Sequence, residues 1–259
     1  MIVALKELEA ATQSEALSKT QIWGDAVARV AREIWADGFA FVPGADVTRL
    51  LSASARLAWP AFAASWDDLG LDKYMADGGR YRRRRHASFQ VTPERIALNP
   101  RRAHYQGRDH NRLNGGVHRW FDSVAPDVTS SDLTSEVLGI CRSVFQRLEG
   151  DATSQKRLVE MHQFRIEPSA FGGAKPTPEG MHRDGVKLVC ILLIGRVNVD
   201  QGVTTIADRN GFRLGSFTLQ HAFDTLLIDD RRVMHGVTPI SRVDPMHPGH
   251  RDVLVLTFD

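Results

Sequence analysis

The fold is decided by residues 178–185 (PEGMHRDG) and by the apolar run of residues 186–194 (VKLVCILLI) that follows them. In an extended strand, side chains alternate between the two faces, so His182 and Asp184 point the same way. An imidazole and a carboxylate placed in this manner can hold one metal ion from one side. The stretch therefore predicts the first half of a metal site.

A third ligand is required, because two histidines and one carboxylate form the facial set that leaves positions open on Fe(II). His235 is available in residues 233–239 (VMHGVTP), a short segment typical of a strand that ends in a turn. A second His-x-Asp pair, His250 and Asp252, lies so near the end of the chain that no histidine follows it. The predicted catalytic and metal-binding residues are therefore His182, Asp184 and His235.

Together with Arg251, which opens the last predicted strand, these three residues resemble the site of the Fe(II)/2-oxoglutarate-dependent dioxygenases. Residues 180–185, 235–239 and 251–255 are similar to a bacterial branch that includes hydroxylases of free L-amino acids such as isoleucine and leucine. The similarity runs from about Phe39 to the C-terminus. It implies a double-stranded β-helix, a cupin-like jelly roll with flanking helices, and it implies Fe(II), 2-oxoglutarate and O2 as cofactor and co-substrates.

The resemblance also implies the reaction and the binding of the co-substrate. Oxidative decarboxylation of 2-oxoglutarate to succinate and CO2 would be coupled to hydroxylation of an unactivated C–H bond. Arg251 is expected to bind the far carboxylate of 2-oxoglutarate. Many relatives carry a hydroxyl two residues later, where this chain has Val253, so we expect a second anchor at Thr204 or Thr205.

The substrate implied by this branch is a small polar zwitterion, and its binding residues depend on one strand. Residues 157–166 (RLVEMHQFRI) predict a strand with Val159, Met161, Gln163 and Arg165 on one face and Leu158, His162, Phe164 and Ile166 on the other. Spacing leaves open which face looks inward, and the resemblance favours the first. The expected substrate-binding residues are Gln163, Arg165 and, from the arginine run, Arg83.

That arginine run, residues 78–89 (GGRYRRRRHASF), is the most basic part of the chain. Alternation places Tyr81, Arg83, Arg85, Ala87 and Phe89 on one face and leaves the other arginines solvated. Arginines among aromatics suit nucleic-acid binding, but surface charge or an arginine that clamps a small carboxylate explains them better. Residues 99–121 are a polar surface connection or, as the related branch favours, a lid, whose histidines His104, His110 and His118 are expected to be hydrogen-bonded rather than metal ligands.

We expect one domain over residues 1–259, with mostly helical elements over residues 1–75 packed on the sheet and the metal-bearing jelly-roll core over residues 155–259. Amphipathic spacing predicts helices over residues 14–37 and 131–147, and Pro60 is expected to block a helix that starts near Asp46.

The net charge of +2 argues against nucleic-acid or membrane partners, and Cys141 and Cys190 suit reduced core thiols. The expected protein is cytoplasmic, because the chain shows no signal-peptide pattern and no membrane-spanning run. Its oligomeric state stays open, a homodimer being one option. Two alternatives to a dioxygenase remain: a non-catalytic jelly-roll sensor or binding protein, and a cupin-like metal enzyme that does not use 2-oxoglutarate.

Overall fold

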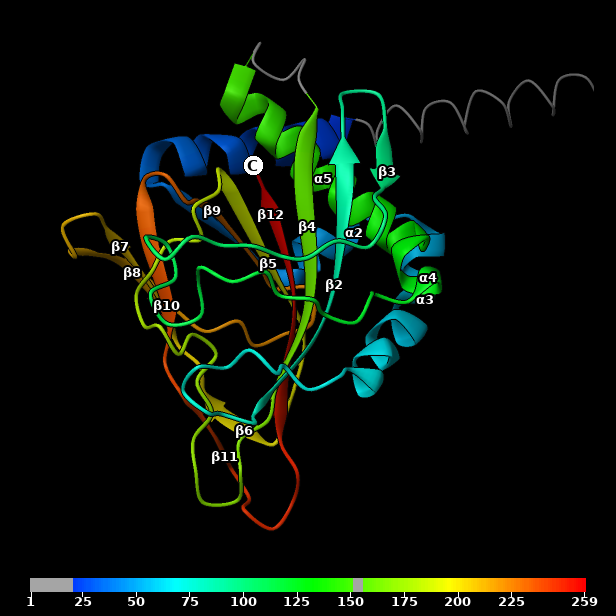
Figure 1. Ribbon diagram of the computed structural model, residues 1–259. Helices are drawn as coiled ribbons and strands as arrows, with labels where there is room; N and C mark the ends of the chain where they lie inside the picture. The colour runs from blue at the N-terminus through cyan, green and yellow to red at the C-terminus, as the bar shows by residue number, and fades with distance from the viewer. Residues whose placement is uncertain (1–20, 151–155) are drawn as a thin grey trace, which may run out of the picture.

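The computed structural model describes residues 21–150 and 156–259, and its centre is a large antiparallel sheet (Figure 1). The strands of this sheet lie in the order β1 (Phe39–Val42), β9 (Thr225–Asp229), β5 (Leu188–Val197), β12 (His250–Phe258), β4 (Arg157–Ile166), β2 (Arg82–Val91) and β3 (Ile96–Leu98). Residues 188–194 of the apolar run lie in β5, which pairs with β9 and β12, whereas His182 and Asp184, expected in an extended strand, precede it in a loop. The strand that carries Arg251 is therefore in the middle of the sheet.

A smaller sheet packs against one face of the large one. It contains β10 (Val233–Val237), β7 (Thr204–Asp208) and β8 (Arg213–Phe217), and a further pair joins β6 (Val199–Gln201) to β11 (Ile240–Arg242). Val189, Leu193 and Val253 from the large sheet meet Ile206 and Val233 from the small one in a buried apolar cluster. Two sheets closed around such a core are the predicted double-stranded β-helix, or jelly roll.

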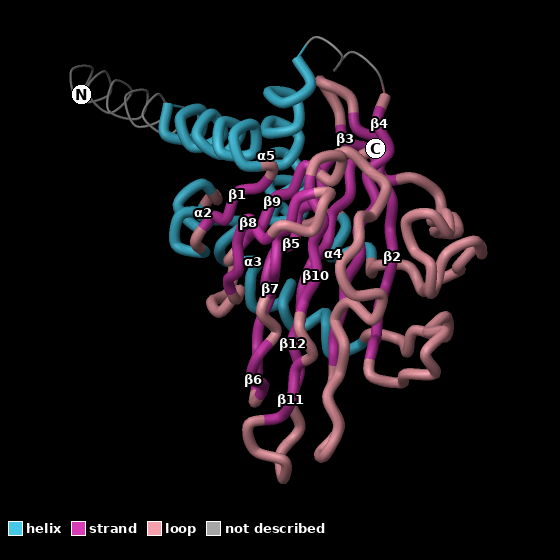
Figure 2. The backbone as a smooth tube through the Cα atoms, turned by 90° about the vertical axis from the view of Figure 1, so that its left-hand side faces the viewer, coloured by secondary structure: helices cyan, strands magenta, loops and turns pink. Residues whose placement is uncertain are grey.

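The helices cover the other face of the large sheet. Besides the helical residues 21–37, they are α2 (Gly44–Leu50), α3 (Ala53–Ala64), the short η1 (Ser65–Asp68), α4 (Pro126–Thr129) and α5 (Asp132–Glu149). Figure 2 shows them in cyan on the side away from the long loops. None of the helices in the described ranges is long and apolar enough to cross a bilayer.

Local signals explain most helix boundaries. Ser131 accepts a hydrogen bond from Thr134 N at the start of α5, and Gly150 follows its end with a φ of 59°, which suits glycine. The helix predicted for residues 14–37 is confirmed over residues 21–37, and its earlier part lies outside the described residues. The prediction that Pro60 blocks a helix is wrong. The break comes before it, where Ser52 caps α3, and Pro60 lies inside α3.

The predicted direction of the β4 side chains is also wrong. Val159 and Met161 pack in the cluster under the helices, whereas Leu158, Glu160, His162 and Phe164 line a pocket on the other face. The register explains the assignment, because Phe164 pairs with Val253 of the inter-sheet core and residues opposite each other in a ladder share a face. Gln163 and Arg165 therefore face the helices.

Candidate metal centre and adjoining pocket

The structure brings His182, Asp184 and His235 together. One ligand atom from each lies within 4.8 Å of the others. His182 Nε2 is 3.7 Å from Asp184 Oδ1, and His235 Nε2 is 3.6 Å from Asp184 Oδ2. These gaps exceed hydrogen-bond length, so the three groups surround a space into which their donor atoms point.

Backbone contacts hold the three groups in place. His182 and His235 form an isolated antiparallel bridge, with N–O distances of 3.0 and 2.9 Å, which ties the loop before β5 to β10. Asp230 is buried and accepts from the backbone N–H groups of Asp184 and Gly185 at 2.9 and 2.7 Å. The ligand loop is therefore fastened by its main chain, which leaves its side chains free to bind a metal.

The donor set suits a ferrous ion. Burial and the neighbouring His182 lower the pKa of His235 to about 3, so this imidazole is neutral at pH 7 and offers a lone pair. Burial alone would lower the pKa of His182, but Asp184 and Glu179 outweigh it and raise that pKa. Two imidazoles and one carboxylate are the facial set of non-haem Fe(II) enzymes. The residues present therefore fit the metal.

Arg251 lies on the interior face of β12, with Val253 and Val255 in the same row. Its side chain is buried, and burial together with Arg196 lowers its pKa to about 10. Arg251 Nε and Arg196 Nη1 are buried nitrogens without a hydrogen-bond partner among the described residues. Arg196 already donates through Nη2 to Gln201 O at 2.7 Å, so the unfilled buried donors of this pair, within the described ranges, are these two nitrogens. A buried donor without an acceptor is costly, so both nitrogens are suited to a carboxylate ligand.

The second predicted anchor, Thr204, is buried on β7 on the same face as Ile206, which packs between the sheets. Arg196 is a further candidate for the second anchor of the 2-oxoglutarate carboxylate, and it was not predicted from the sequence. A Cβ at Gly202 would lie 3.1 Å from Arg196 Nη1 and 3.6 Å from Arg251 Cδ, so this glycine leaves space beside both guanidinium groups.

The three predicted substrate-binding residues are not brought to the pocket. Arg165 makes a two-point ion pair with Asp252, at 2.8 and 2.7 Å, on the helix side of the sheet. Gln163 donates to Ser65 Oγ at 2.8 Å, and Arg83 pairs with Glu167 at 2.7 Å. The placement of Gln163 and Arg165 beside the metal followed from the wrong face of β4 and is corrected. Arg83, expected from the arginine run, lies on β2 opposite Arg165 and is corrected with them.

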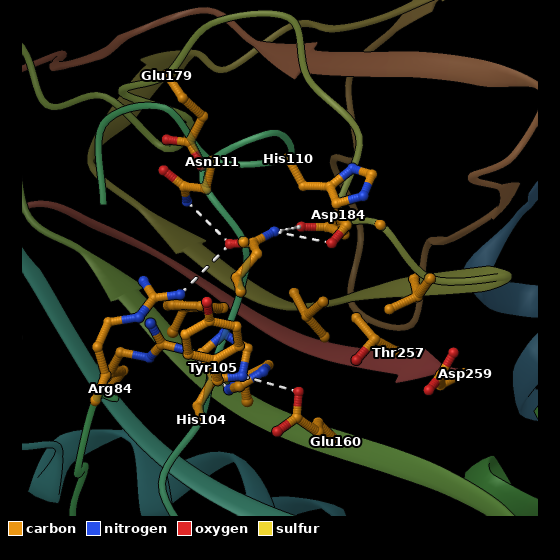
Figure 3. Close-up of a pocket in the computed structure, with 18 of the residues that line it drawn as sticks. Arg84, His104, Tyr105, His110, Asn111, Glu160, Glu179, Asp184, Thr257 and Asp259 are labelled. Atoms are coloured by element: carbon orange, nitrogen blue, oxygen red, sulfur yellow. Dashed lines mark hydrogen bonds and ion pairs between the residues drawn. The ribbon is translucent and has the colours of Figure 1, made fainter. Parts of the chain in front are cut away.

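A pocket of about 230 Å³ adjoins Asp184 (Figure 3). Its floor comes from β2, β4 and β12, and residues 104–111 with Arg119 cover it, which supports the lid interpretation of residues 99–121. Leu158, Val186 and Val255 form an apolar part of the wall. The arginines that reach it are Arg82, Arg84 and Arg119, all buried, so the expectation that Arg82 and Arg84 are solvated is wrong.

The pocket also contains a cluster of histidines around Glu160. His104 Nδ1 lies 2.8 Å from Glu160 Oε2, and His86 Nε2 lies 3.2 Å from Glu160 Oε1. Burial alone would raise the pKa of Glu160, but these two histidines outweigh it and hold that pKa well below its usual range. His104 is thus hydrogen-bonded, as predicted, but it belongs to the pocket. Burial lowers its pKa to about 4 despite the opposing effect of Glu160.

Several site residues were not anticipated from the sequence, namely Gln106, Asp230, Glu179, Arg196 and the cluster around Glu160. The alternation in β2 and β4 contained the necessary signal, because placing His162 inward also places His86 and Glu160 inward. The loop residues carry no such periodicity. Only the folded backbone brings Gln106 to Asp184 or Asp230 to the ligand loop.

Comparisons with solved structures agree with this fold. The chain is similar to a bsmA homologue from Methylobium petroleophilum, with 34% identity over 90% of this chain and 92% of that one and a TM-score of 0.80. It is also similar in fold to IDO from Bacillus thuringiensis, at 18% identity over 90% of this chain and 98% of that one, with a TM-score of 0.76.

Comparisons of sequence identify the family. A 3(1)-hydroxy-L-isoleucine 4-dioxygenase of Pantoea ananatis is 23% identical over 229 residues, which cover 85% of this chain and 91% of that protein. Residues 63–257 match the family model described as 2OG-Fe dioxygenase. The chain therefore belongs to the 2OG-Fe dioxygenase family and is a 2-oxoglutarate-dependent dioxygenase that uses Fe(II), 2-oxoglutarate and O2.

Proposed function

We propose that this dioxygenase hydroxylates the side chain of a free aliphatic L-amino acid. The observation that carries the proposal is the pocket beside Asp184, which joins buried arginines and partly buried carboxylates to an apolar wall. Its volume of about 230 Å³ is below the roughly 300–1,000 Å³ of pockets that take drug-sized molecules. A small zwitterion with an aliphatic side chain suits that size and lining, and the relative from Pantoea ananatis is named for an isoleucine derivative.

In this proposal each part of the site has one task. His182, Asp184 and His235 hold Fe(II), which when bound supplies the chemistry that activates O2 at the expense of 2-oxoglutarate. Arg251 binds the far carboxylate of 2-oxoglutarate, with Arg196 or Thr204 beside it. The loop of residues 104–111 covers the substrate and excludes water from it.

The test is the production of succinate from 2-oxoglutarate, Fe(II) and air in the presence of each of the twenty L-amino acids. Stimulation by one or a few aliphatic amino acids, with a product heavier by one oxygen atom, is the expected result. N-acylated amino acids and short peptides serve as controls, since the pocket should not admit them. Stimulation by those larger compounds alone would contradict the proposal, and absence of stimulation by any compound would favour a binding protein.

A further inference from the structure

Glu160 carries a negative charge into the pocket with part of its hydrogen-bonding capacity unused. His104 and His86 each approach one of its two oxygens, and both imidazoles are largely buried. An ionised carboxylate has about four acceptor positions, so about two remain. The side chain retains 13% exposure and lines the pocket, and Figure 3 shows it on a different side of the pocket from Asp184. Glu160 is therefore fixed in place with acceptor positions available to a ligand.

The cluster around Glu160 is poorly suited to a second metal ion. His86, His104, Glu160 and His162 do present ligand atoms within 4.8 Å of one another. However, Arg84 Nη2 lies 2.8 Å from His162 Nδ1, and the guanidinium can only donate, so this contact occupies the nitrogen's lone pair. The rings of His86 and His162 stack at 4.8 Å with planes 22° apart, so their in-plane lone pairs run side by side instead of converging. An organic cation that donates hydrogen bonds suits Glu160 better.

Arg119 offers the opposite charge next to this cluster. It is 2% exposed, it lines the pocket, and its Nε has no hydrogen-bond partner in the parts of the chain that the structure describes. Its Nη2 makes one long contact of 3.4 Å, to Gln106 Oε1. Arg119 and His104 also exchange backbone hydrogen bonds at 2.9 Å. The unsatisfied guanidinium is therefore adjacent to the histidine that fixes Glu160.

We propose that Glu160 receives the α-ammonium group of the substrate and Arg119 receives its α-carboxylate. The two groups of an α-amino acid are carried by one carbon atom, so their receptors must be neighbours. Glu160 and Arg119 meet this condition through His104, whose ring contacts Glu160 and whose backbone bonds to Arg119, and both residues line the pocket. In this orientation the aliphatic side chain runs along Val186 and Val255 towards Asp184. The inference rests on the proposed function and adds to it the direction in which the substrate enters.

Glu179 is the competing receptor for the ammonium group. It also lines the pocket, and its Oε2 is buried without a partner in the described ranges. Its Oε1, however, lies 3.8 Å from His182 Nε2, beside the metal ligands. An ammonium group bound there would bring the α-carbon to the metal and exclude the side chain, so we assign the role to Glu160.

The experiment measures equilibrium binding to the Fe(II)- and 2-oxoglutarate-loaded enzyme without oxygen. Three probes are compared: L-isoleucine, L-isoleucinamide, which lacks the carboxylate charge, and the matching 2-hydroxy acid, which lacks the ammonium group. The variants are Glu160→Gln, Arg119→Gln and Glu179→Gln. Two further variants, Glu136→Gln and Arg49→Gln, are matched controls, because Glu136 bonds to Ser52 and Arg49 pairs with Asp46 outside the pocket.

For the wild type, L-isoleucine should bind about 10- to 100-fold more tightly than either analogue, as expected for one charge-assisted hydrogen bond. Glu160→Gln should abolish the preference over the hydroxy acid and keep the preference over the amide. Arg119→Gln should abolish the preference over the amide and keep the preference over the hydroxy acid. If Glu160→Gln does not fold, Glu160→Asp replaces it. Glu160→Asp should weaken the binding of L-isoleucine and of the amide and leave the binding of the hydroxy acid unchanged.

Three results would overturn the inference. If a variant weakens the binding of all three probes equally, the replaced residue has a structural role only. If Glu179→Gln, and not Glu160→Gln, loses the preference for L-isoleucine over the hydroxy acid, Glu179 is the residue that receives the ammonium group. A second metal equivalent per chain that disappears in Glu160→Gln would make the cluster a metal site. By contrast, a wild type that neither binds any aliphatic L-amino acid nor forms succinate in the presence of one would refute the proposed function and the inference together.

Discussion

The side-chain amide of Gln106 donates to Asp184 at two points, 3.0 Å to its carbonyl oxygen and 3.3 Å to its carboxylate oxygen Oδ1. The other end of the same amide accepts from Asn111 at 3.0 Å and from Arg119 at 3.4 Å. Gln106 therefore connects the loop that covers the pocket to a predicted metal ligand. It is a positioning residue, since it acts on Asp184.

Replacing Gln106 should weaken metal binding. Outer partners of metal ligands typically contribute about 10- to 100-fold in affinity, so Gln106→Ala should raise the dissociation constant for Fe(II) or Co(II) by a factor in that range. Titration of the metal-free protein under anaerobic conditions measures it. Gln90→Ala, at an exposed position on β2, is the control and should bind metal as the wild type does. An unchanged affinity in Gln106→Ala would refute the positioning role.

Removing the carboxylate ligand should abolish turnover. Asp184→Ala should form no succinate above background and bind Fe(II) much more weakly, because only His182 and His235 remain. Asp68→Ala, whose side chain is 88% exposed, should retain wild-type activity. Full activity in Asp184→Ala would dismiss the three-residue metal site.

Arg251 should have opposite effects on stability and on co-substrate binding. Its buried guanidinium is unsatisfied at Nε, so Arg251→Met should raise the melting temperature of the protein without 2-oxoglutarate. The same variant should bind 2-oxoglutarate about 10- to 100-fold more weakly. Thermal melts with and without 2-oxoglutarate measure both effects. A variant that still gains wild-type stabilisation from 2-oxoglutarate would exclude Arg251 as its anchor.

The buried histidine His104 should make the fold sensitive to mild acid. The unfolded chain takes up a proton as the pH falls through about 6.5, whereas burial delays protonation of the folded form until about pH 4. The unfolded state binds more protons in that interval, so the free energy of unfolding should fall as the pH drops from 6.5 to 4. His104→Asn, which keeps an N–H donor for Glu160, should flatten this dependence in urea titrations. His247→Asn, at an exposed position, should leave the dependence unchanged.

Arg165 should matter for stability more than for substrate affinity. Arg165 and Asp252 form a buried ion pair, and removing one partner of such a pair typically lowers the free energy of unfolding by about 3–5 kcal/mol. The loss in Asp252→Ala should be smaller, because Arg165 keeps its contact with Asp67. The paired change Arg165→Met with Asp252→Leu should recover much of the loss. Denaturant unfolding measures both. A normal unfolding free energy combined with weakened amino-acid binding in Arg165→Ala would instead support the substrate role expected from the sequence.

The sequence was sufficient where periodicity or local chemistry determines structure. The apolar run predicted a buried strand, which the structure has over residues 188–194 of it, and the glycine after α5 and the serine before it mark the ends of that helix. The grouping of His182, Asp184 and His235 followed from spacing and from family resemblance, and the structure places the three within reach of one ion.

The errors arose where two faces of a strand are equally plausible. In β4, both rows contain apolar and polar residues, and the choice depends on where α3 and α5 pack. Arg165 looked like a substrate residue because its partner Asp252 lies far along the chain and pairs with it only through the β4–β12 register. The loop contacts of Gln106 and Asp230 depend on tertiary structure alone.

The fastening of the ligand loop by Asp230 has a practical consequence. The main-chain N–H groups of Asp184 and Gly185 donate to this buried carboxylate, and the His182–His235 bridge ties the loop to β10. The polypeptide alone therefore holds the metal ligands in position. Protein stripped of iron with a chelator should therefore regain full occupancy within the mixing time of a ferrous salt, with no refolding step. Reconstitution, rather than expression in iron-rich medium, is then the practical route to a uniformly loaded enzyme.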